Sequence, residues 1–428
     1  MKINNHMKKI LFCILFFPLF IHCSKGEIED PTETENPPEI ENVSEFPIMA
    51  WLGVPESETS PERFKELKDA GININFARYY SVKAVEEALN VAKQTGIKIL
   101  PYCDELWTET EKTVMRLKEH PALAGYHLRD EPCATDFPVL AEWAKRIRSV
   151  DREHGCYINL FPNYATREQL LGKGATLEPG QDPYEEYLRK FLKTVPVSYL
   201  SFDHYPILVV EGIRAMRPNW YQNLEVVARV SADAGIPFWA FAMVVAHDPY
   251  PVPTVEELRL QMFSNLAYGA QTLQYFTYWH PGEGTAWNFH DSPINLDGTR
   301  TVVYDRVQTV NREIHSMAHL FLGAKVLSVY HTGKQIPEGT RRLDKLPKQI
   351  KLLNTGDDGG AVVSFLEKGK KRFLAIVNRD FKRPMKLNIS TAKEVKRVQK
   401  DGKLVSLANN IEEISVEPGD MIIYAWEK

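Results

Sequence analysis

The stretch L-A-G-Y-H-L-R-D-E-P, residues 123–132, predicts the fold of the chain. It begins as an apolar run and ends in charged residues, which is typical of a buried strand that releases charges at its carboxyl end. Pro132 cannot donate a ladder hydrogen bond, so strand pairing should stop there. Asp130 and Glu131 are therefore expected at a rigid strand end, where parallel α/β folds keep their reactive groups. The alternative is that both acids only favour the start of the next helix.

Seven further stretches repeat this pattern, with polar helical periods between them. Strands are expected at residues 48–54, 72–79, 97–103, 122–128, 156–161, 199–205, 237–245 and 272–279. Helices are expected at 61–70, 82–95, 111–120, 137–153, 184–194, 222–234, 255–268 and 302–320. Eight strands alternating with helices predict a (β/α)₈ TIM barrel over residues 46–320. An open doubly wound sheet is the rival, but no Gly-rich phosphate loop follows the first strand.

The pattern changes after residue 320. Helical periodicity disappears, and short apolar runs at 361–366, 372–377, 385–389, 394–399 and 421–426 alternate with turn residues. Several short strands separated by turns predict an antiparallel β-sandwich over residues 321–428. The expected fold class is thus α/β, a TIM barrel followed by a small C-terminal β-sandwich domain.

The first residues predict export. Lys8 and Lys9 precede the apolar run 10–21, which is too short to span a bilayer as a mature helix. Cys23 follows, as in a bacterial lipobox, so residues 1–23 are interpreted as a lipoprotein signal peptide ending at lipidated Cys23. Residues 24–45 are rich in Glu, Pro, Thr and Asn and predict a disordered tether. We expect an exported lipoprotein of the outer membrane or cell surface; a plain secreted protein is the alternative.

Composition narrows the possible partners. The net charge of −4 gives no basic surface for nucleic acid. Three cysteines remain in the body, Cys103, Cys133 and Cys156, and their spacing matches neither a zinc site nor a disulfide framework. No metal and no cofactor are predicted. The expected partners are a carbohydrate and, through the lipid anchor, a membrane; oligomeric state does not follow from the sequence.

Polar and aromatic residues follow the expected strands. Since the carboxyl ends of barrel strands meet at one face, these residues should share one site. The candidate substrate-binding residues are Arg78, Tyr80, Asp104, Trp107, Asp130, Asn163, His204, Tyr205, Tyr278 and Trp279. Carboxylates accept hydrogen bonds from pairs of sugar hydroxyls, and flat aromatic rings stack on sugar C–H faces. This combination of residues favours a carbohydrate ligand. The alternative is that the aromatic rings only close the top of the core.

Three motifs carry a family resemblance: G-Y-H-L-R-D-E-P at 125–132, F-D-H-Y-P at 202–206 and Y-F-T-Y-W at 275–279. Together they resemble a clan A glycoside hydrolase, most nearly the family 42-like, β-galactosidase-related surface lipoproteins of Bacteroidetes. The resemblance implies a (β/α)₈ barrel that hydrolyses glycosides, with Glu131 as the general acid/base at the end of strand four. The clan also carries a nucleophilic glutamate at the end of strand seven. Here that stretch reads I-P-F-W-A-F-A-M-V-V-A-H-D, without a glutamate.

Glycoside cleavage needs one protonated acid and one carboxylate, so Glu131 requires a partner. Asp203, which opens the tip of strand six, is our first choice as the second catalytic residue. The reserves are Asp104, Asp248 and Glu283. A carboxyl separation of about 5 Å would indicate retention of configuration, and roughly 6.5–9.5 Å would indicate inversion.

Three functions remain open at this point. The first is a hydrolase of oligo- or polysaccharides. The second is a catalytically inactive barrel that binds glycan at the cell surface, which the missing strand-seven glutamate favours. The third, a metal-dependent hydrolase, is least favoured because no H-x-H motif follows the first strand.

Overall fold

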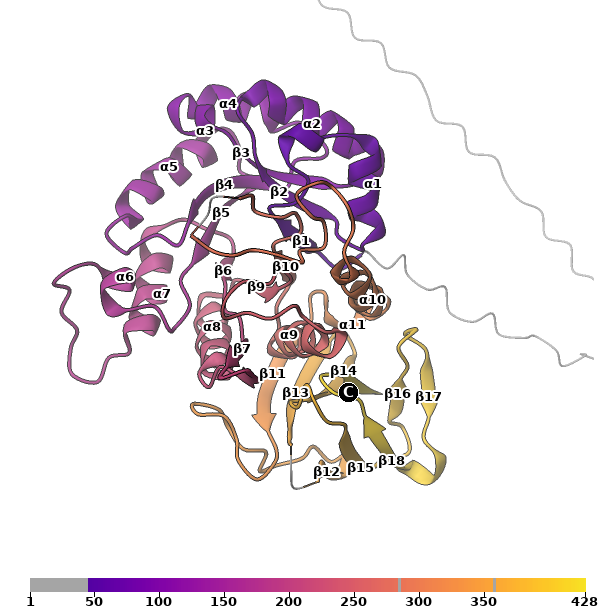
Figure 1. Cartoon of the computed structure of the whole chain (residues 1–428). Helices are drawn as coiled ribbons and strands as arrows, with labels where there is room; N and C mark the ends of the chain where they lie inside the picture. The colour runs from indigo at the N-terminus through magenta and orange to yellow at the C-terminus, as the bar shows by residue number, and fades with distance from the viewer. Residues whose placement is uncertain (1–44, 284–285, 357–358) are drawn as a thin grey trace, which may run out of the picture. The chain divides into compact units, whose positions relative to one another are not determined.

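The computed structural model describes residues 45–283, 286–356 and 359–428. The expected signal peptide, the expected lipidation site Cys23 and all but the last residue of the expected tether lie outside the described residues. Eight parallel strands form the first part of the described chain (Figure 1). They are β1 (Ile48–Trp51), β2 (Ile74–Arg78), β3 (Lys98–Tyr102), β4 (Gly125–Asp130), β5 (Gly155–Leu160), β6 (Leu200–Phe202), β9 (Phe238–Met243) and β10 (Thr272–Phe276).

The eight strands close into a barrel. Their order is β3-β2-β1-β10-β9-β6-β5-β4, and every pairing is parallel. The two ends of this order meet just before β4, where Ile99 N donates to Ala122 O and Ala124 N donates to Ile99 O, both at 2.7 Å. The predicted (β/α)₈ barrel is confirmed, and the open doubly wound sheet is excluded.

Helices surround the barrel, and each longer one lies within three residues of its expected start. They are α1 (Pro61–Asp69), α2 (Val82–Thr95), α3 (Asp104–Thr108), α4 (Thr110–Leu117), α5 (Phe137–Val150), α6 (Arg167–Leu171), α7 (Pro183–Thr194), α8 (Trp220–Ala234), α9 (Val255–Tyr268), α10 (Val302–Ser316) and α11 (Ala318–Phe321). Short α3 and α6, the 3₁₀ turn η1 (Glu56–Glu58) and the hairpin of β7 (Ile207–Val210) and β8 (Ile213–Met216) were not expected from the pattern. None of the described helices is both long and apolar enough to cross a bilayer.

Local signals explain where the helices start and stop. The Ser60 side chain accepts from Arg63 N at the start of α1. Thr254 and Glu257 form a reciprocal capping box at the start of α9. Helix α2 ends at Gly96 in the left-handed conformation that glycine adopts without a Cβ penalty. These helices therefore start or end at defined residues, and this fixes the positions of the neighbouring strand ends.

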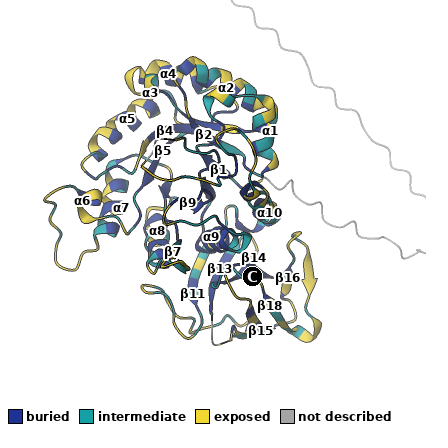
Figure 2. Ribbon diagram, viewed as in Figure 1, coloured by how far each residue is buried: buried dark blue, intermediate teal, exposed yellow. Residues whose placement is uncertain are grey.

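Two apolar layers hold the barrel together. Figure 2 shows the strands buried and the outward faces of the helices exposed. One layer lies between strands and helices and includes Ile48, Leu89 and Ile158, all nearly inaccessible to solvent. The other fills the barrel interior with large side chains such as Trp51, Phe76, Leu100, Tyr157 and Phe241. Because aromatic rings fill the lower interior, polar chemistry is left to the carboxyl end of the barrel.

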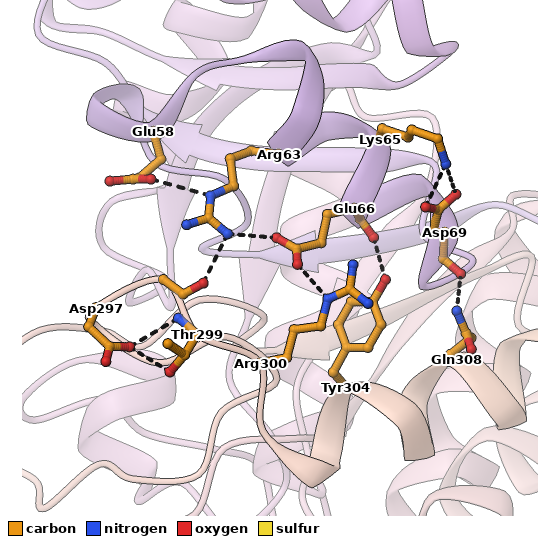
Figure 3. Close-up of polar contacts among 11 residues, drawn as sticks. Glu58, Arg63, Lys65, Glu66, Asp69, Asp297, Thr299, Arg300, Tyr304 and Gln308 are labelled. Atoms are coloured by element: carbon orange, nitrogen blue, oxygen red, sulfur yellow. Dashed lines mark hydrogen bonds and ion pairs between the residues drawn. The ribbon is translucent and has the colours of Figure 1, made fainter.

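A polar network fastens the long connection between β10 and α10 onto α1 (Figure 3). Arg63 donates to Glu66 at 2.8 Å and to the carbonyl of Gly298 at 2.9 Å. The Glu66 carboxylate also accepts from Arg300 Nε at 2.5 Å. Tyr304, on α10, donates to the Glu66 backbone carbonyl at 2.8 Å. The first and last helices of the barrel are thereby joined around one partly buried carboxylate.

The C-terminal strands form two antiparallel sheets. The larger has the order β11-β13-β14-β19-β16-β17 and the smaller β12-β15-β18. Their bounds are β11 (Lys325–His331), β12 (Ile350–Asn354), β13 (Ala361–Lys368), β14 (Lys371–Asn378), β15 (Met385–Thr391), β16 (Lys396–Val398), β17 (Leu404–Ser406), β18 (Ile411–Val416) and β19 (Met421–Glu427), with the 3₁₀ turn η2 (Ala408–Asn410). One apolar cluster, with Leu374, Leu387 and Trp426, draws on strands of both sheets. The predicted fold class is confirmed.

Candidate active site

The end of β4 contains a β-bulge that sets the direction of its side chains. His127 pairs with Tyr157 and Asp130 pairs with Asn159, so three steps on β4 oppose two on β5. Such an insertion re-aims the side chains beyond it. Asp130 therefore lies on the inward face with Asn159, whereas Arg129 pairs with Ile158, whose side chain packs toward the helices.

Glu131 follows the bulge in an unusual backbone conformation. Its φ is +44°, in the left-handed region that side chains other than glycine rarely adopt. Pro132 disfavours this conformation further, because a residue before proline is pushed toward extended backbone. Glu131 N donates to Asn159 O at 2.8 Å, which holds the strained residue in place. The conformation costs on the order of 1–2 kcal/mol, and backbone strain of this size is concentrated at functional sites.

Asn159 connects the acids of two strands. Its Nδ2 donates to Asp130 Oδ1 at 3.1 Å and to Asp203 Oδ1 at 2.9 Å. Its own Oδ1 accepts from Ser201 Oγ at 3.0 Å, which fixes which end of the amide faces the acids. Deeper in the barrel, Gln274 Nε2 donates to Ser201 Oγ at 3.0 Å and Tyr157 donates to Gln274 Oε1 at 2.6 Å. A buried network of hydrogen bonds thus holds Asn159 in place, and Asn159 positions the two aspartates.

Glu131 and Asp203 are hydrogen-bonded to each other, and we call them the carboxyl pair. Burial, followed by the charge of Asp130, raises the pKa of Glu131 to about 7, although the hydrogen bond with Asp203 opposes this rise. Burial and the charges of Glu131 and Asp130 raise the pKa of Asp203 well above its usual range, against the Asn159 hydrogen bond. Neighbouring acids in a desolvated site cannot both ionise readily, so the pair keeps a proton near neutral pH.

This arrangement predicts a stability change that depends on pH. A carboxyl whose pKa is raised on folding favours the folded state below its unfolded pKa and loses that contribution as pH rises through the folded value of about 7. Glutamine cannot ionise, so Glu131→Gln should be more stable than the wild type at pH 8 by about 1 kcal/mol or more, with a smaller difference at pH 5. Urea unfolding at both pH values measures this. The same change at exposed Glu62 on α1 is the control, and equal effects at both sites would contradict the prediction.

Some of the other predicted residues lie near the carboxyl pair or in the barrel interior. Asp130 is close enough for its charge to raise the pKa of Glu131. Burial, followed by the charge of Asp203, raises the pKa of Tyr205. Arg78 ends β2 over the ring of Tyr102, 4.9 Å from its centroid. Burial, followed by the charge of Arg78, lowers the pKa of interior His127 to about 3. His204 is buried behind Tyr164, with ring centroids 4.9 Å apart, and burial lowers its pKa to about 3. A neutral imidazole is the expected form there.

Several predicted residues are not brought to the carboxyl pair. Asn163 Nδ2 instead donates to the backbone carbonyl of Asn219 at 3.1 Å, and Asn219 Nδ2 donates to Asn163 Oδ1 at 2.8 Å. Tyr80 is 91% exposed. Asp104 lies exposed at the start of α3, with Trp107 on the same short helix.

Tyr278 and Trp279 belong to the core rather than to an open site. They are 1% and 5% exposed. Backbone bonds from Tyr278 N to Trp51 O at 3.1 Å and from Trp279 N to Leu52 O at 2.8 Å draw them back against the end of β1. Arg63 lies over the Trp279 ring, 5.1 Å from its centroid.

The reserve acids also have their own surroundings. Asp248 accepts from Asn288 Nδ2 at 3.1 Å on the loops after β9 and β10. Beyond β9 the chain runs through Val244, Val245 and Ala246, all fully buried, to His247, which is 6% exposed. His247 lies among the rings of Tyr250 and Phe289. Aromatic and aliphatic groups therefore occupy the tip of the seventh barrel strand.

Asn159, Ser201 and Gln274 are functional candidates that sequence reasoning missed. Each is a single polar residue inside an otherwise apolar strand, Y-I-N-L, L-S-F and T-L-Q-Y. A buried polar side chain needs a partner, so three of them at barrel-facing positions signal an interior polar chain. In the described part of the chain, no group of three His, Cys, Asp or Glu side chains is placed to hold a metal ion. The described cysteines are free, Cys103 and Cys156 buried and Cys133 half-buried.

Known structures share the fold. No family model matches the sequence, and no curated protein matches it. A β-galactosidase from Bacillus circulans sp. alkalophilus superposes with a TM-score of 0.57 at 10% identity, over 90% of this chain and 99% of its own. A catalytic mutant of a family 42 β-galactosidase from G. stearothermophilus gives 0.54 at 9% identity, over 90% and 99%. A β-galactosidase from the psychrophilic Marinomonas ef1 gives 0.46 at 10% identity over 64% of this chain, which spans only 60% of that protein. The expected resemblance to family 42 enzymes is confirmed at the level of the fold.

Proposed function

We propose that the protein is a glycoside hydrolase in which Glu131 protonates the glycosidic oxygen and Asp203 is the second carboxylate. The observation that carries this proposal is the hydrogen-bonded carboxyl pair at the carboxyl end of the barrel, with the pKa of Glu131 raised to about 7. An acid with such a pKa still holds its proton near neutrality and can donate it to a leaving group. Hydrolysis then needs a second protein carboxylate beside the cleaved bond, and Asp203 supplies it.

A sugar would have to enter between the two carboxyls of the pair. A retaining enzyme holds its carboxyls roughly 5–5.5 Å apart and an inverting enzyme roughly 6.5–9.5 Å apart. A bound sugar would replace the hydrogen bond between Glu131 and Asp203 with its own hydroxyl and glycosidic oxygens. Asn159 would keep Asp203 in place during this exchange, since it also binds Asp130. The separation in the sugar complex would then decide between retention and inversion.

Exposed aromatic side chains support a carbohydrate substrate. In the described part of the chain, Tyr80, Trp107, Tyr164 and Trp287 are the aromatic residues with widely exposed side chains, between 38% and 91%. They follow β2, β3, β5 and β10, so all four lie at the carboxyl end of the barrel, Trp107 on the short helix α3 and the other three on loops. Exposed rings are costly in water, and sugars offer the flat C–H faces that cover them.

A catalytically inactive, glycan-binding barrel is the second candidate, and the absence of a glutamate at the tip of β9 favours it. Release of reducing sugar from a panel of polysaccharides, by the wild type and by Glu131→Gln, separates the two. We expect wild-type turnover on at least one glycan and a strong loss in the variant. Binding without turnover on any glycan would favour the second candidate and overturn the first.

We also propose that Cys23 is lipidated and tethers the protein to the outer membrane or cell surface. The basic residues Lys8 and Lys9, the apolar run 10–21 and the position of Cys23 support this. Cys23→Ala should move most of the protein from the membrane fraction to the soluble fraction, because a single lipid anchor would be lost. Unchanged fractionation would contradict a lipid anchor at this residue.

A further inference from the structure

A concave site lies at the carboxyl ends of two barrel strands. It is a groove of about 330 Å³ between the ends of β3 and β4 and the helices α3 and α5. Its lining includes Tyr102, Trp107, Arg129, Asp136, Val139 and Trp143, and we call it the Trp107 groove. Its volume is at the lower end of the range for small-ligand sites, which suits a single sugar ring.

The groove presents a rigid aromatic face. Trp107 is 44% exposed, and its ring stands edge-on to Trp143, at 84° with 4.7 Å between centroids. Trp143 is itself fixed, because it is 5% exposed and its Nε1 donates to Leu106 O at 3.0 Å. The Trp107 ring is thus supported from behind while much of its surface stays open. Such a platform needs no ordering when a flat ligand stacks on it.

Opposite charges border this platform. Arg129 is exposed and was turned toward the helices by the bulge in β4, while Asp136 precedes α5. A guanidinium offers only donors and an ionised carboxylate only acceptors, so together they can satisfy hydroxyl groups, which do both. Since the two charges balance, a neutral sugar fits this site better than an acidic one.

The groove and the carboxyl pair share the end of β4. Arg129 lines the groove and lies two residues before Glu131, and its charge opposes the rise that burial causes in the pKa of Asp130. Around the barrel the groove lies at β3 and β4, whereas Asp203 follows β6 and is separated from β4 by β5. The groove is therefore on the side of Glu131 that faces away from Asp203.

We propose that the Trp107 groove binds a neutral sugar unit of the leaving group, next to the bond that Glu131 protonates. This inference rests on the proposed hydrolase function, because the general acid always stands on the leaving-group side of the bond. It identifies the substrate as an oligosaccharide or polysaccharide with at least one sugar beyond the cleaved bond. A simple glycoside with a small leaving group would not fill the groove.

Binding to an inactive variant tests the groove without turnover. Oligosaccharides of increasing length are titrated calorimetrically into Glu131→Gln and into the double variant Glu131→Gln/Trp107→Ala. We expect the double variant to bind oligosaccharides that reach the groove about 10–100-fold more weakly, because one stacked ring is lost. Trp107→Phe in the same background should keep most of the affinity, and Met115→Ala, an exposed truncation on α4, should change nothing. Equal binding with and without the Trp107 ring would overturn the proposal.

Kinetics separate the groove from the acid. In the active protein, Trp107→Ala should raise KM for an oligosaccharide about 10-fold or more with kcat nearly kept, and should leave an aryl glycoside unaffected. Loss of kcat with unchanged KM would contradict a binding role. If the wild type hydrolyses nothing, the hydrolase function fails, while the titration still decides whether the groove binds sugar.

Discussion

Glu131→Gln is expected to reduce turnover of glycosides with poor leaving groups by about 10²–10⁴-fold, with little change in binding. The substitution keeps the shape of the side chain and removes the proton that the raised pKa retains near neutrality. Substrates with a good leaving group need little protonation and should lose far less activity. Parallel measurement of kcat on an unactivated oligosaccharide and on an activated aryl glycoside gives this contrast.

The contrast distinguishes a general acid from a carboxylate that only binds substrate. A binding carboxylate would weaken both substrates alike, because its contact does not depend on the leaving group. The pH profile adds a second check, since wild-type activity should fall as pH rises through the region near 7 where Glu131 loses its proton. If Glu131→Gln is silent on every substrate that the wild type hydrolyses, the assignment of the acid is wrong.

Asp203→Asn is expected to slow both kinds of substrate by roughly 10³–10⁴-fold, because the second carboxylate acts whatever the leaving group. Asparagine fits the same space and can still accept from Asn159 Nδ2, which now donates to Asp203 at 2.9 Å. Loss of fold is therefore not the expected cause, and a thermal melt at pH 6 checks this directly. The measurement is kcat/KM for the same two substrates used for Glu131.

A matched set of variants tests the choice of Asp203. Asp104→Asn, Asp248→Asn and Glu283→Gln change the acids that the sequence offered as alternatives. Asp104 is exposed, and Asp248 pairs with Asn288 on the loops after β9 and β10, so neither change should matter greatly. If one of these three variants abolishes turnover while Asp203→Asn is nearly silent, the partner is reassigned and the role of Glu131 stands.

The barrel could be predicted from the sequence because it repeats one local pattern eight times. Each strand is a short apolar run and each helix has its own start or stop signal, as at Ser60 and Gly96. Since a parallel barrel brings all strand tips to one face, the meeting of Glu131 and Asp203 followed from topology alone. Their direct hydrogen bond did not follow, because side-chain reach depends on the local direction of each tip.

The errors arose where the chain leaves its strand earlier than the apolar pattern suggests. β5 ends at Leu160 rather than after it, so the amide that meets the acids is Asn159, inside the strand, and Asn163 lies beyond it. β10 ends at Phe276, and the following residues turn back to bind β1, which buries Tyr278. Hydrophobic runs cannot reveal such endings, because the residues after the strand are also apolar and buried.

The bulge in β4 means that the site depends on the strand register as well as on the identity of its residues. If the same residues of β4 paired with β5 without the bulge, Arg129 would lie opposite Asn159, and the D-E-P motif in the sequence would be unchanged. The faces that Arg129 and Asp130 present would nevertheless be exchanged, because strand side chains alternate. A protein with the same motif and no bulge would turn its arginine toward Asn159 and its aspartate toward the Trp107 groove. A motif search alone would not distinguish the two proteins, whereas their strand register would.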